Sequence, residues 1–111
     1  MVQLAARLDS GFAALSDGTR RGILVRLGRG DASISDLAEK FDMTLTGMKK
    51  HVRLLEEAGL VTTEKVGRVR SCRLGPRRLD DEAAFIDHYR EMLEGQLDRL
   101  GEFLRKQGEG Q

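Results

Sequence analysis

The sequence predicts a mainly α-helical fold with one small β-hairpin. Apolar residues recur at spacings of three and four along most of the chain, which is the pattern of helices that bury one face. Two runs of β-type residues, 61–66 and 69–74, are separated only by Gly67 and Arg68, the length of a tight hairpin turn. The chain has 111 residues, of which 40% are hydrophobic, so we expect one core and a single domain over residues 1–111.

Two helices are expected in the first part of the chain. The first spans residues 4–15, and its apolar face consists of Leu4, Leu8, Phe12 and Leu15. Asp17 is suited to cap a second helix, because its carboxylate can accept hydrogen bonds from the first free N–H groups. The apolar positions of that helix are Ile23, Leu24 and Leu27, and the glycine-containing segment 28–31 ends it.

Two further helices are expected within residues 35–58, on either side of a three-residue break at 42–44. Ser35 and Thr44 are the expected N-caps. The second of these helices should bury a row of side chains at spacings of four and three, namely Met48, Val52 and Leu55, with Leu54 alongside. Its opposite face then carries Leu45, Thr46, Lys49 and Arg53. Gly59 ends the helix.

The hairpin at 61–74 completes a familiar arrangement. Two helices joined by a tight turn and followed by a hairpin form a winged helix-turn-helix, in which the second helix lies in a DNA major groove. The hairpin is the wing, and Arg68 at its tip is placed to reach a minor groove or a backbone phosphate. The order of the elements therefore predicts a protein that binds double-stranded DNA.

The last expected helix, residues 80–106, contains no proline and has a broad apolar face. Because a small domain does not need so much apolar surface on a terminal helix, we expect the first and last helices to form the interface of a homodimer. The expected interface residues are Leu4, Leu8, Phe12, Phe85, Ile86, Tyr89, Leu93, Leu97, Leu100 and Leu104.

Charge is distributed unevenly along the chain. The whole sequence has 19 basic and 18 acidic residues, a net charge of +1. Residues 44–78 contain nine basic and three acidic side chains, a net charge of +6, whereas residues 79–111 contain four basic and nine acidic ones, a net charge of −5. Positive charge is therefore concentrated in the helix-turn-helix and wing, as a phosphate-facing surface requires.

The expected DNA contacts differ in chemistry. Those placed to touch base edges are Leu45, Thr46 and Lys49. Those placed to contact phosphates are Thr44, Lys50 and Arg53, and the wing adds Arg68 and Arg70. The alternative is that these side chains only form a solvated surface. For Arg73, Arg77 and Arg78, ion pairs with the acidic start of the last helix are an equal alternative.

Two segments carry a resemblance to a known family. With Leu-Ser-Asp-Gly-Thr-Arg-Arg-Gly-Ile-Leu at 15–24, Met-Lys-Lys-His-Val-Arg-Leu-Leu-Glu-Glu-Ala-Gly-Leu-Val at 48–61, and the Gly67-Arg68 turn, the chain resembles ArsR/SmtB-type bacterial transcriptional regulators. The resemblance implies a homodimer that binds an inverted-repeat operator and usually represses it. The sequence departs from the family pattern at Gly18, Lys49 and Cys72, so base preference cannot be transferred from relatives.

Metal ligands are scarce. The chain has one cysteine and two histidines, and Asp87 and His88 in the last helix are adjacent, about 100° apart around the helix axis. We therefore expect a member that does not sense metals and needs no cofactor.

Cys72 is expected to be a buried apolar side chain, with redox sensing as the alternative, and His51 either forms a local hydrogen bond or contacts phosphate.

Other functions are less consistent with the sequence. Neither a nucleophile beside a histidine motif nor a phosphate-binding glycine loop is present, so we do not expect an enzyme. A winged-helix module that binds only proteins is the alternative function. The single cysteine and the lack of a long apolar run predict a cytoplasmic protein with no membrane partner. An unknown apolar effector could occupy the seam between the first and last helices, although no polar residues mark a pocket there.

Overall fold

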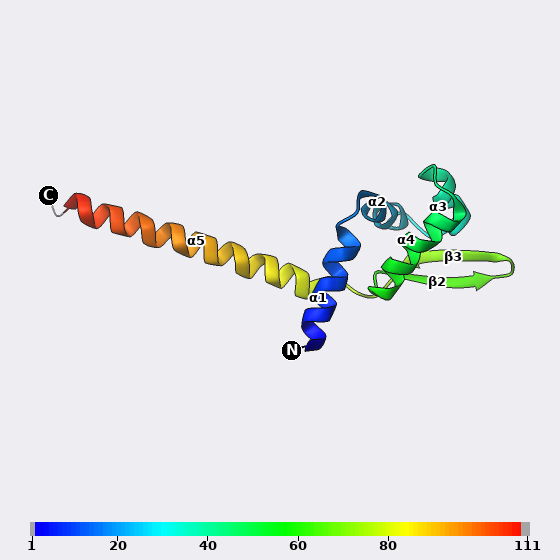
Figure 1. Cartoon of the computed structure of the whole chain (residues 1–111), viewed down its shortest axis with the longest axis horizontal. Coiled ribbons are helices and arrows are strands. Elements are labelled where there is room, and N and C mark those ends of the chain that lie inside the picture. The colour runs from blue at the N-terminus through cyan, green and yellow to red at the C-terminus, as the bar shows by residue number, and fades with distance from the viewer. Residues whose placement is uncertain (1, 110–111) are drawn as a thin grey trace. The chain divides into compact units, whose positions relative to one another are not determined.

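A computed structural model describes residues 2–109 and divides after Leu79 into two compact units. The first unit contains helices α1 (Val2–Leu15), α2 (Gly18–Leu27), α3 (Ile34–Lys40) and α4 (Leu45–Glu57), with strands β1 (Ala32–Ser33), β2 (Val61–Val66) and β3 (Val69–Leu74). The second is the single helix α5 (Asp80–Glu109) (Figure 1). The mainly helical winged helix-turn-helix predicted from the sequence is confirmed.

Polar side chains define where three of the helices begin. The Asp17 carboxylate accepts a hydrogen bond from the backbone N–H of Arg20 at the start of α2, and the Thr44 hydroxyl accepts one from Gly47 at the start of α4. Both N-caps were predicted. The predicted cap of α3 was wrong, because the Ser33 hydroxyl accepts the N–H of Asp36, while Ser35 is an exposed residue inside the helix. Ser33 has the extended backbone that a cap requires because it belongs to β1.

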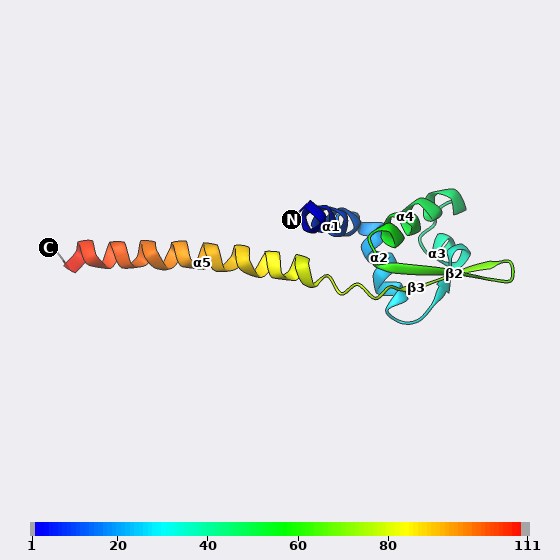
Figure 2. The same ribbon diagram turned by 90° about the horizontal axis from the view of Figure 1, so that it is seen from below.

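The three strands form one antiparallel sheet in the order β1-β3-β2. In the hairpin, Val66 pairs with Val69 and Val61 pairs with Leu74, so the predicted wing at 61–74 and its two-residue turn are confirmed. Gly67 in this turn has a φ of 64°, which a residue without Cβ adopts at little cost. Figure 2 shows the hairpin turn extending beyond helices α2, α3 and α4. The two-residue β1 was not predicted, and it joins the start of α3 to the wing strand β3.

The core of the first unit lies between the helices and the inner part of the sheet. Its members are Ala14, Ile23, Leu27, Ala32, Ile34, Leu37, Ala38, Met48, Val52, Leu55, Ala58, Leu60, Val61 and Cys72. The predicted row of α4 is confirmed, because Met48, Val52 and Leu55 are at most 3% exposed. Leu54 was wrongly placed alongside them and is 46% exposed, since adjacent residues point about 100° apart on a helix. Gly59, with a φ of 78°, follows the end of α4.

The second unit, α5, is 30 residues long and extends the predicted helix from Lys106 to Glu109. Its first turn contains Asp80, Asp81 and Glu82, which interact favourably with the helix dipole. Its large apolar side chains from Phe85 onward are between 44% and 67% exposed. Among residues 2–109, no helix has the length and apolarity that crossing a membrane would demand.

Candidate nucleic-acid interface

Helix α4 presents a polar face because its apolar face is covered. The side chains of Met48, Val52 and Leu55 point into the core of the unit, which leaves the opposite side of the helix in solvent. All of the predicted DNA-facing residues of this segment are exposed, namely Thr44, Leu45, Thr46, Lys49, Lys50 and Arg53. The predicted orientation of the helix is confirmed, and α4 is called the recognition helix below.

A groove of about 350 Å³ separates the recognition helix from the wing. It is lined by Ser33, Ile34, Ser35, Leu45, Lys49, Lys65, Arg68, Val69 and Arg70. Four of these side chains are cationic, one from the recognition helix and three from the wing. The groove therefore offers a concave, positively charged surface of the kind that attracts phosphate groups.

Lys65 is a groove residue that the sequence analysis did not identify. It pairs directly with Arg70 across the hairpin, and like charges at opposite positions of two antiparallel strands repel each other. An anion bound in the groove would relieve this repulsion. The signal was available in the sequence, because a two-residue turn at 67–68 requires that residue 65 faces residue 70.

Two of the predicted cationic DNA contacts have partners within the protein. The Arg70 guanidinium donates to the Thr63 hydroxyl (3.1 Å), and that hydroxyl donates to the Glu56 carboxylate (2.6 Å), which connects the wing to the recognition helix. Arg53 Nε lies 3.3 Å from Glu57 Oε1 in an exposed ion pair along α4. Within residues 2–109, no acidic side chain forms an ion pair with Lys49 or Arg68.

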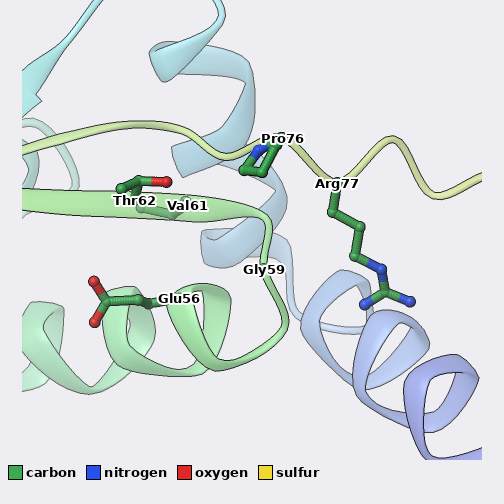
Figure 3. Close-up of a pocket in the computed structure, with 6 residues that line it drawn as sticks. All are labelled: Glu56, Gly59, Val61, Thr62, Pro76 and Arg77. Atoms are coloured by element: carbon green, nitrogen blue, oxygen red, sulfur yellow. The ribbon is translucent and has the colours of Figure 1, made fainter. Parts of the chain in front are cut away.

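Arg77 has a structural contact that the sequence analysis did not anticipate. Its guanidinium donates to the carbonyl of Ala58 at the end of α4 (2.8 Å) and to the carbonyl of Arg7 in α1 (2.9 Å). Figure 3 shows Arg77 beside Pro76, at the edge of a pocket of about 410 Å³ that Glu56 and Thr62 also line. These bonds connect the end of the recognition helix to α1, so Arg77 helps to position the recognition helix.

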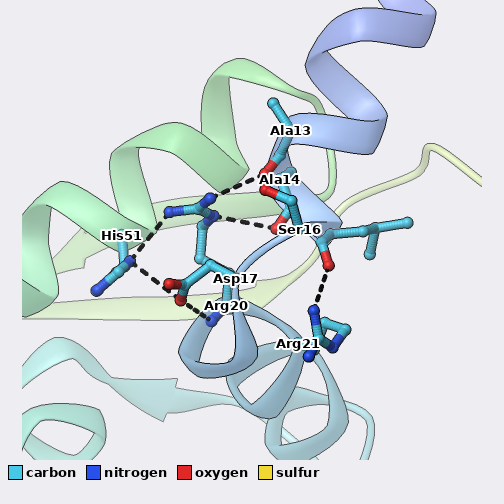
Figure 4. A network of polar contacts seen from close by, with 8 residues as sticks. Ala13, Ala14, Ser16, Asp17, Arg20, Arg21 and His51 are labelled. Atoms are coloured by element: carbon cyan, nitrogen blue, oxygen red, sulfur yellow. Dashed lines mark hydrogen bonds and ion pairs between the residues drawn. The ribbon is translucent and has the colours of Figure 1, made fainter.

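His51 was predicted either to form a local hydrogen bond or to contact phosphate, and it forms a hydrogen bond within the protein whose partner lies 31 residues away in the sequence. Its Nδ1 lies 3.4 Å from the Arg20 guanidinium and 3.9 Å from Asp17 Oδ2. Figure 4 shows this network between α2 and the recognition helix. The hydrogen bond from the Arg20 backbone N–H, with the positive charge of the Arg20 side chain nearby, lowers the pKa of Asp17 below its usual 3.8 against a smaller opposing effect of burial.

Cys72 is fully buried in strand β3, as predicted. Burial, together with a smaller effect of the Glu56 carboxylate and against an opposing effect of Arg70, raises the pKa of its thiol from 9.0 to about 11. The thiol is therefore protonated at neutral pH and shielded from solvent, which makes it a poor nucleophile. In the described part of the chain, no three His, Cys, Asp or Glu side chains lie together in a way that could hold a metal ion.

The geometry defines a class of protein. A helix with a covered apolar face and an exposed cationic face, flanked by a basic wing, is the structure with which winged helix-turn-helix proteins bind DNA.

Comparisons with known proteins agree with this class. A helix-turn-helix domain model matches residues 15–64. The chain is 34% identical over 81 residues to the HTH-type transcriptional regulator Rv2034 of Mycobacterium tuberculosis, which covers 73% of this chain and 76% of that protein. It is 33% identical over 60 residues to the transcriptional repressor SdpR of Bacillus subtilis, covering 54% of this chain and 67% of SdpR.

A solved structure of an ArsR-like transcriptional regulator from Rhodococcus sp. RHA1 superposes with a TM-score of 0.80 at 34% identity, covering 96% of this chain and 97% of that chain. The protein therefore belongs to the ArsR-type family of winged helix-turn-helix transcriptional regulators. Both the resemblance stated from the sequence and the prediction of a DNA-binding regulator that is not an enzyme are confirmed.

Proposed function

We propose that this regulator is a cytoplasmic, homodimeric repressor that binds an inverted-repeat operator. The observation that carries the proposal is the outward-facing cationic side of the recognition helix, next to a basic groove and wing. A repressor role is supported by the similarity to SdpR, which is named a transcriptional repressor.

The proposed contacts follow from the position of each side chain. Lys49, with Leu45 and Thr46, lies on the exposed first half of the recognition helix, which is the part that reads base edges in the major groove. The proposed phosphate contacts are Thr44, Lys50 and Arg53, with Arg68 and Arg70 from the wing. Because Arg53 and Arg70 have protein partners, their contribution to affinity should be smaller than that of Arg68.

Dimerisation is proposed to occur through α1 and α5. The side chains of one row on α5 are between 44% and 67% exposed, namely Ile86, Leu93, Leu97, Leu100 and Leu104. Water contact with so many large apolar side chains is unfavourable. In a two-fold symmetric dimer, the same surface of each subunit faces its copy, so a second α5 can cover this apolar row. Two recognition helices related by a two-fold axis would then read the two halves of the operator.

We also propose that the protein does not sense metals. Its Cys72 is buried and protonated, His51 is bonded to Arg20, and His88 is adjacent in sequence to Asp87, about 100° away around α5. These positions do not give the converging set of ligands that a transition metal requires.

Selection of genomic fragments by the purified protein, followed by sequencing, tests the proposal. The expected product is an enriched inverted repeat. On that operator, Lys49→Ala should weaken binding by about 1–3 kcal/mol and relax specificity at one base position. Arg68→Ala should weaken binding to all sequences and lower the salt slope by about one.

The same experiment separates the proposal from its alternative. If the winged helix is only a protein-interaction module, the folded wild-type protein enriches no fragment, and neither substitution changes a mobility shift. Lys40→Ala is a suitable control, because Lys40 is exposed in the last turn of α3 and lines neither the groove nor the exposed face of the recognition helix.

A further inference from the structure

Arg20 in α2 contacts two other helices of the first unit. Its Nε donates to the carbonyl of Ala14 (3.0 Å) and its Nη2 to the carbonyl of Ala13 (2.8 Å), both at the end of α1. Its Nη1 lies 3.4 Å from Nδ1 of His51 in the recognition helix. Figure 4 shows the guanidinium between the carbonyl groups of α1 and the imidazole ring.

We propose that Arg20 and His51 are positioning residues of the DNA interface, which hold the recognition helix at a set orientation to the end of α1. This inference rests on the proposed function and deepens it. DNA affinity then depends on a contact that touches no DNA and that lies between α1 and the recognition helix.

The chemistry of the α1 end explains why an arginine is needed. The last four carbonyl groups of a helix have no partner within that helix, and they carry a partial negative charge. Helix α1 has no basic residue in its own last turn, so Arg20 supplies the donors from α2. A guanidinium is planar and presents five N–H donors in fixed directions, so it can bind two carbonyls and an imidazole together, which a lysine ammonium cannot do with the same rigidity.

His51 is well placed to transmit this contact. It is two residues after Lys49, so its side chain points about 160° away from Lys49 around the helix axis. The bond to Arg20 therefore holds the recognition helix on the side opposite Lys49. Losing this bond would allow the orientation of the whole helix, and hence of its DNA-facing side chains, to change. Because arginine only donates, this contact uses His51 Nδ1 as the acceptor.

Asp17 does not replace this contact. Its Oδ2 is 3.9 Å from His51 Nδ1, beyond hydrogen-bonding distance, and the same oxygen accepts the backbone N–H of Arg20 (3.1 Å) as the cap of α2. Asp17 therefore orders the backbone that carries Arg20, while the Arg20 side chain makes the connection to the recognition helix.

Arg21 provides a matched control. Its Nη1 donates to the carbonyl of Leu15 at the end of α1 (2.7 Å), but among residues 2–109 its side chain has no hydrogen bond to the recognition helix. Both arginines thus donate from α2 to the end of α1, Arg20 to two carbonyls and Arg21 to one, and Arg20 also contacts His51. Comparing Arg20→Gln with Arg21→Gln, and Arg20→Gln with His51→Leu, separates the contact with His51 from the bonds to α1.

The test measures operator affinity over a series of salt concentrations, together with the thermal midpoint of each variant. Arg20→Gln and His51→Leu should each weaken operator binding by about tenfold, within the range measured for coupled neighbouring residues. The salt slope should be unchanged, because no phosphate contact is lost. His51→Asn, whose side-chain oxygen can accept in place of Nδ1, should restore most of the affinity. Combining Arg20→Gln with His51→Leu should add little to either alone.

Several results would overturn the inference. One is an equal loss of affinity for Arg20→Gln and Arg21→Gln, which would indicate only a stability effect. Another is a salt slope lowered by about one, which would make Arg20 or His51 a phosphate contact. A third is failure of His51→Asn to recover affinity in a protein that melts like the wild type. If the wild-type protein selects no DNA at all, the proposed function fails instead, so the two failures are distinguishable.

Discussion

Helices α4 and α5 are both amphipathic, but their apolar faces have different surroundings. In α4, Met48, Val52 and Leu55 are at most 3% exposed, covered by other elements of the same chain. In α5, Leu93 and Leu97 are 44% and 67% exposed. The two helices therefore bury their apolar rows by different means. The row of α4 is covered by folding of the chain itself, whereas in the dimer proposed above the row of α5 is covered by a second molecule.

This difference separates two functions that one chain must combine. Because the core fixes α4 on one side, its cationic side faces outward with a defined orientation. Because α5 contributes little to that core, its apolar row remains available for association. We infer that DNA reading is built into the fold of the first unit, while the pairing of two reading helices depends on protein concentration.

The largest effect is expected on the free energy of unfolding, when one leucine of α4 and one of α5 are each replaced by alanine. Leu55→Ala should destabilise the protein by about 2–5 kcal/mol, because it leaves a cavity in a fully buried site. Leu97→Ala should change unfolding of the monomer by less than about 0.5 kcal/mol, because the side chain is largely in solvent. Denaturant titration at low protein concentration measures both. Similar losses at low concentration would remove the distinction between the helices.

Negative charge introduced on the apolar row of α5 tests whether this row forms the dimer interface. The double substitution Leu93→Glu with Leu97→Glu should abolish the dimer at micromolar concentration, because burying the carboxylates is costly. Operator affinity should fall by about 100-fold, as expected when two linked binding events become independent. Sedimentation and mobility shifts measure the two effects. A variant that remains dimeric would show that α5 is not the interface.

Thiol labelling compares the solvent access of a buried site in the first unit with that of a site on α5 in the same molecule. Folded protein at pH 7 should label Cys72 at least about 100-fold more slowly than unfolded protein, since raising the pKa from 9.0 to about 11 lowers the thiolate fraction by that factor. In the variant Leu97→Cys, the new thiol should label quickly in dilute solution and slowly when concentrated. Mass spectrometry of separate peptides distinguishes the sites. Rapid labelling of Cys72 would instead favour redox sensing.

The smallest effect concerns acid stability of the first unit. The pKa of Asp17 is lowered on folding, so its ionised form stabilises the folded state above its ordinary pKa, near 3.8, and this contribution is lost as the pH falls through the lower folded value. Asp17→Asn keeps a capping side chain but removes the charge. Its thermal midpoint should lie below that of the wild type at pH 6, and the two should converge as the pH falls through the lowered pKa of Asp17. A constant difference would exclude the charge as the cause.

Local patterns in the sequence were sufficient for most elements. The spacing of Met48, Val52 and Leu55 determined which side of α4 is buried. Because residues on the opposite side of the helix must then face solvent, it also determined that Lys49 is exposed. Asp17 and Thr44 identified two helix starts, and Gly67 identified the hairpin turn. Each of these signals acts over a few residues, so it can be read without knowing the rest of the fold.

Two features that sequence reasoning missed depend on contacts between segments that are distant in the sequence. Strand β1 exists only because Ala32 and Ser33 pair with Cys72 and Ser71, and this pairing also makes Ser33 the cap of α3. The bond between Arg20 and His51 likewise joins two helices that are 31 residues apart in the sequence at these positions. The bond from Arg70 to Thr63 lies within one hairpin, but it depends on side-chain placement that the strand pattern does not give. The sequence alone determined the helices, the wing and the direction of the positive face, since these follow from short-range periodicity and turn chemistry. Tertiary structure decided which cations are tethered and which are available, because that depends on the elements that packing brings within hydrogen-bonding distance.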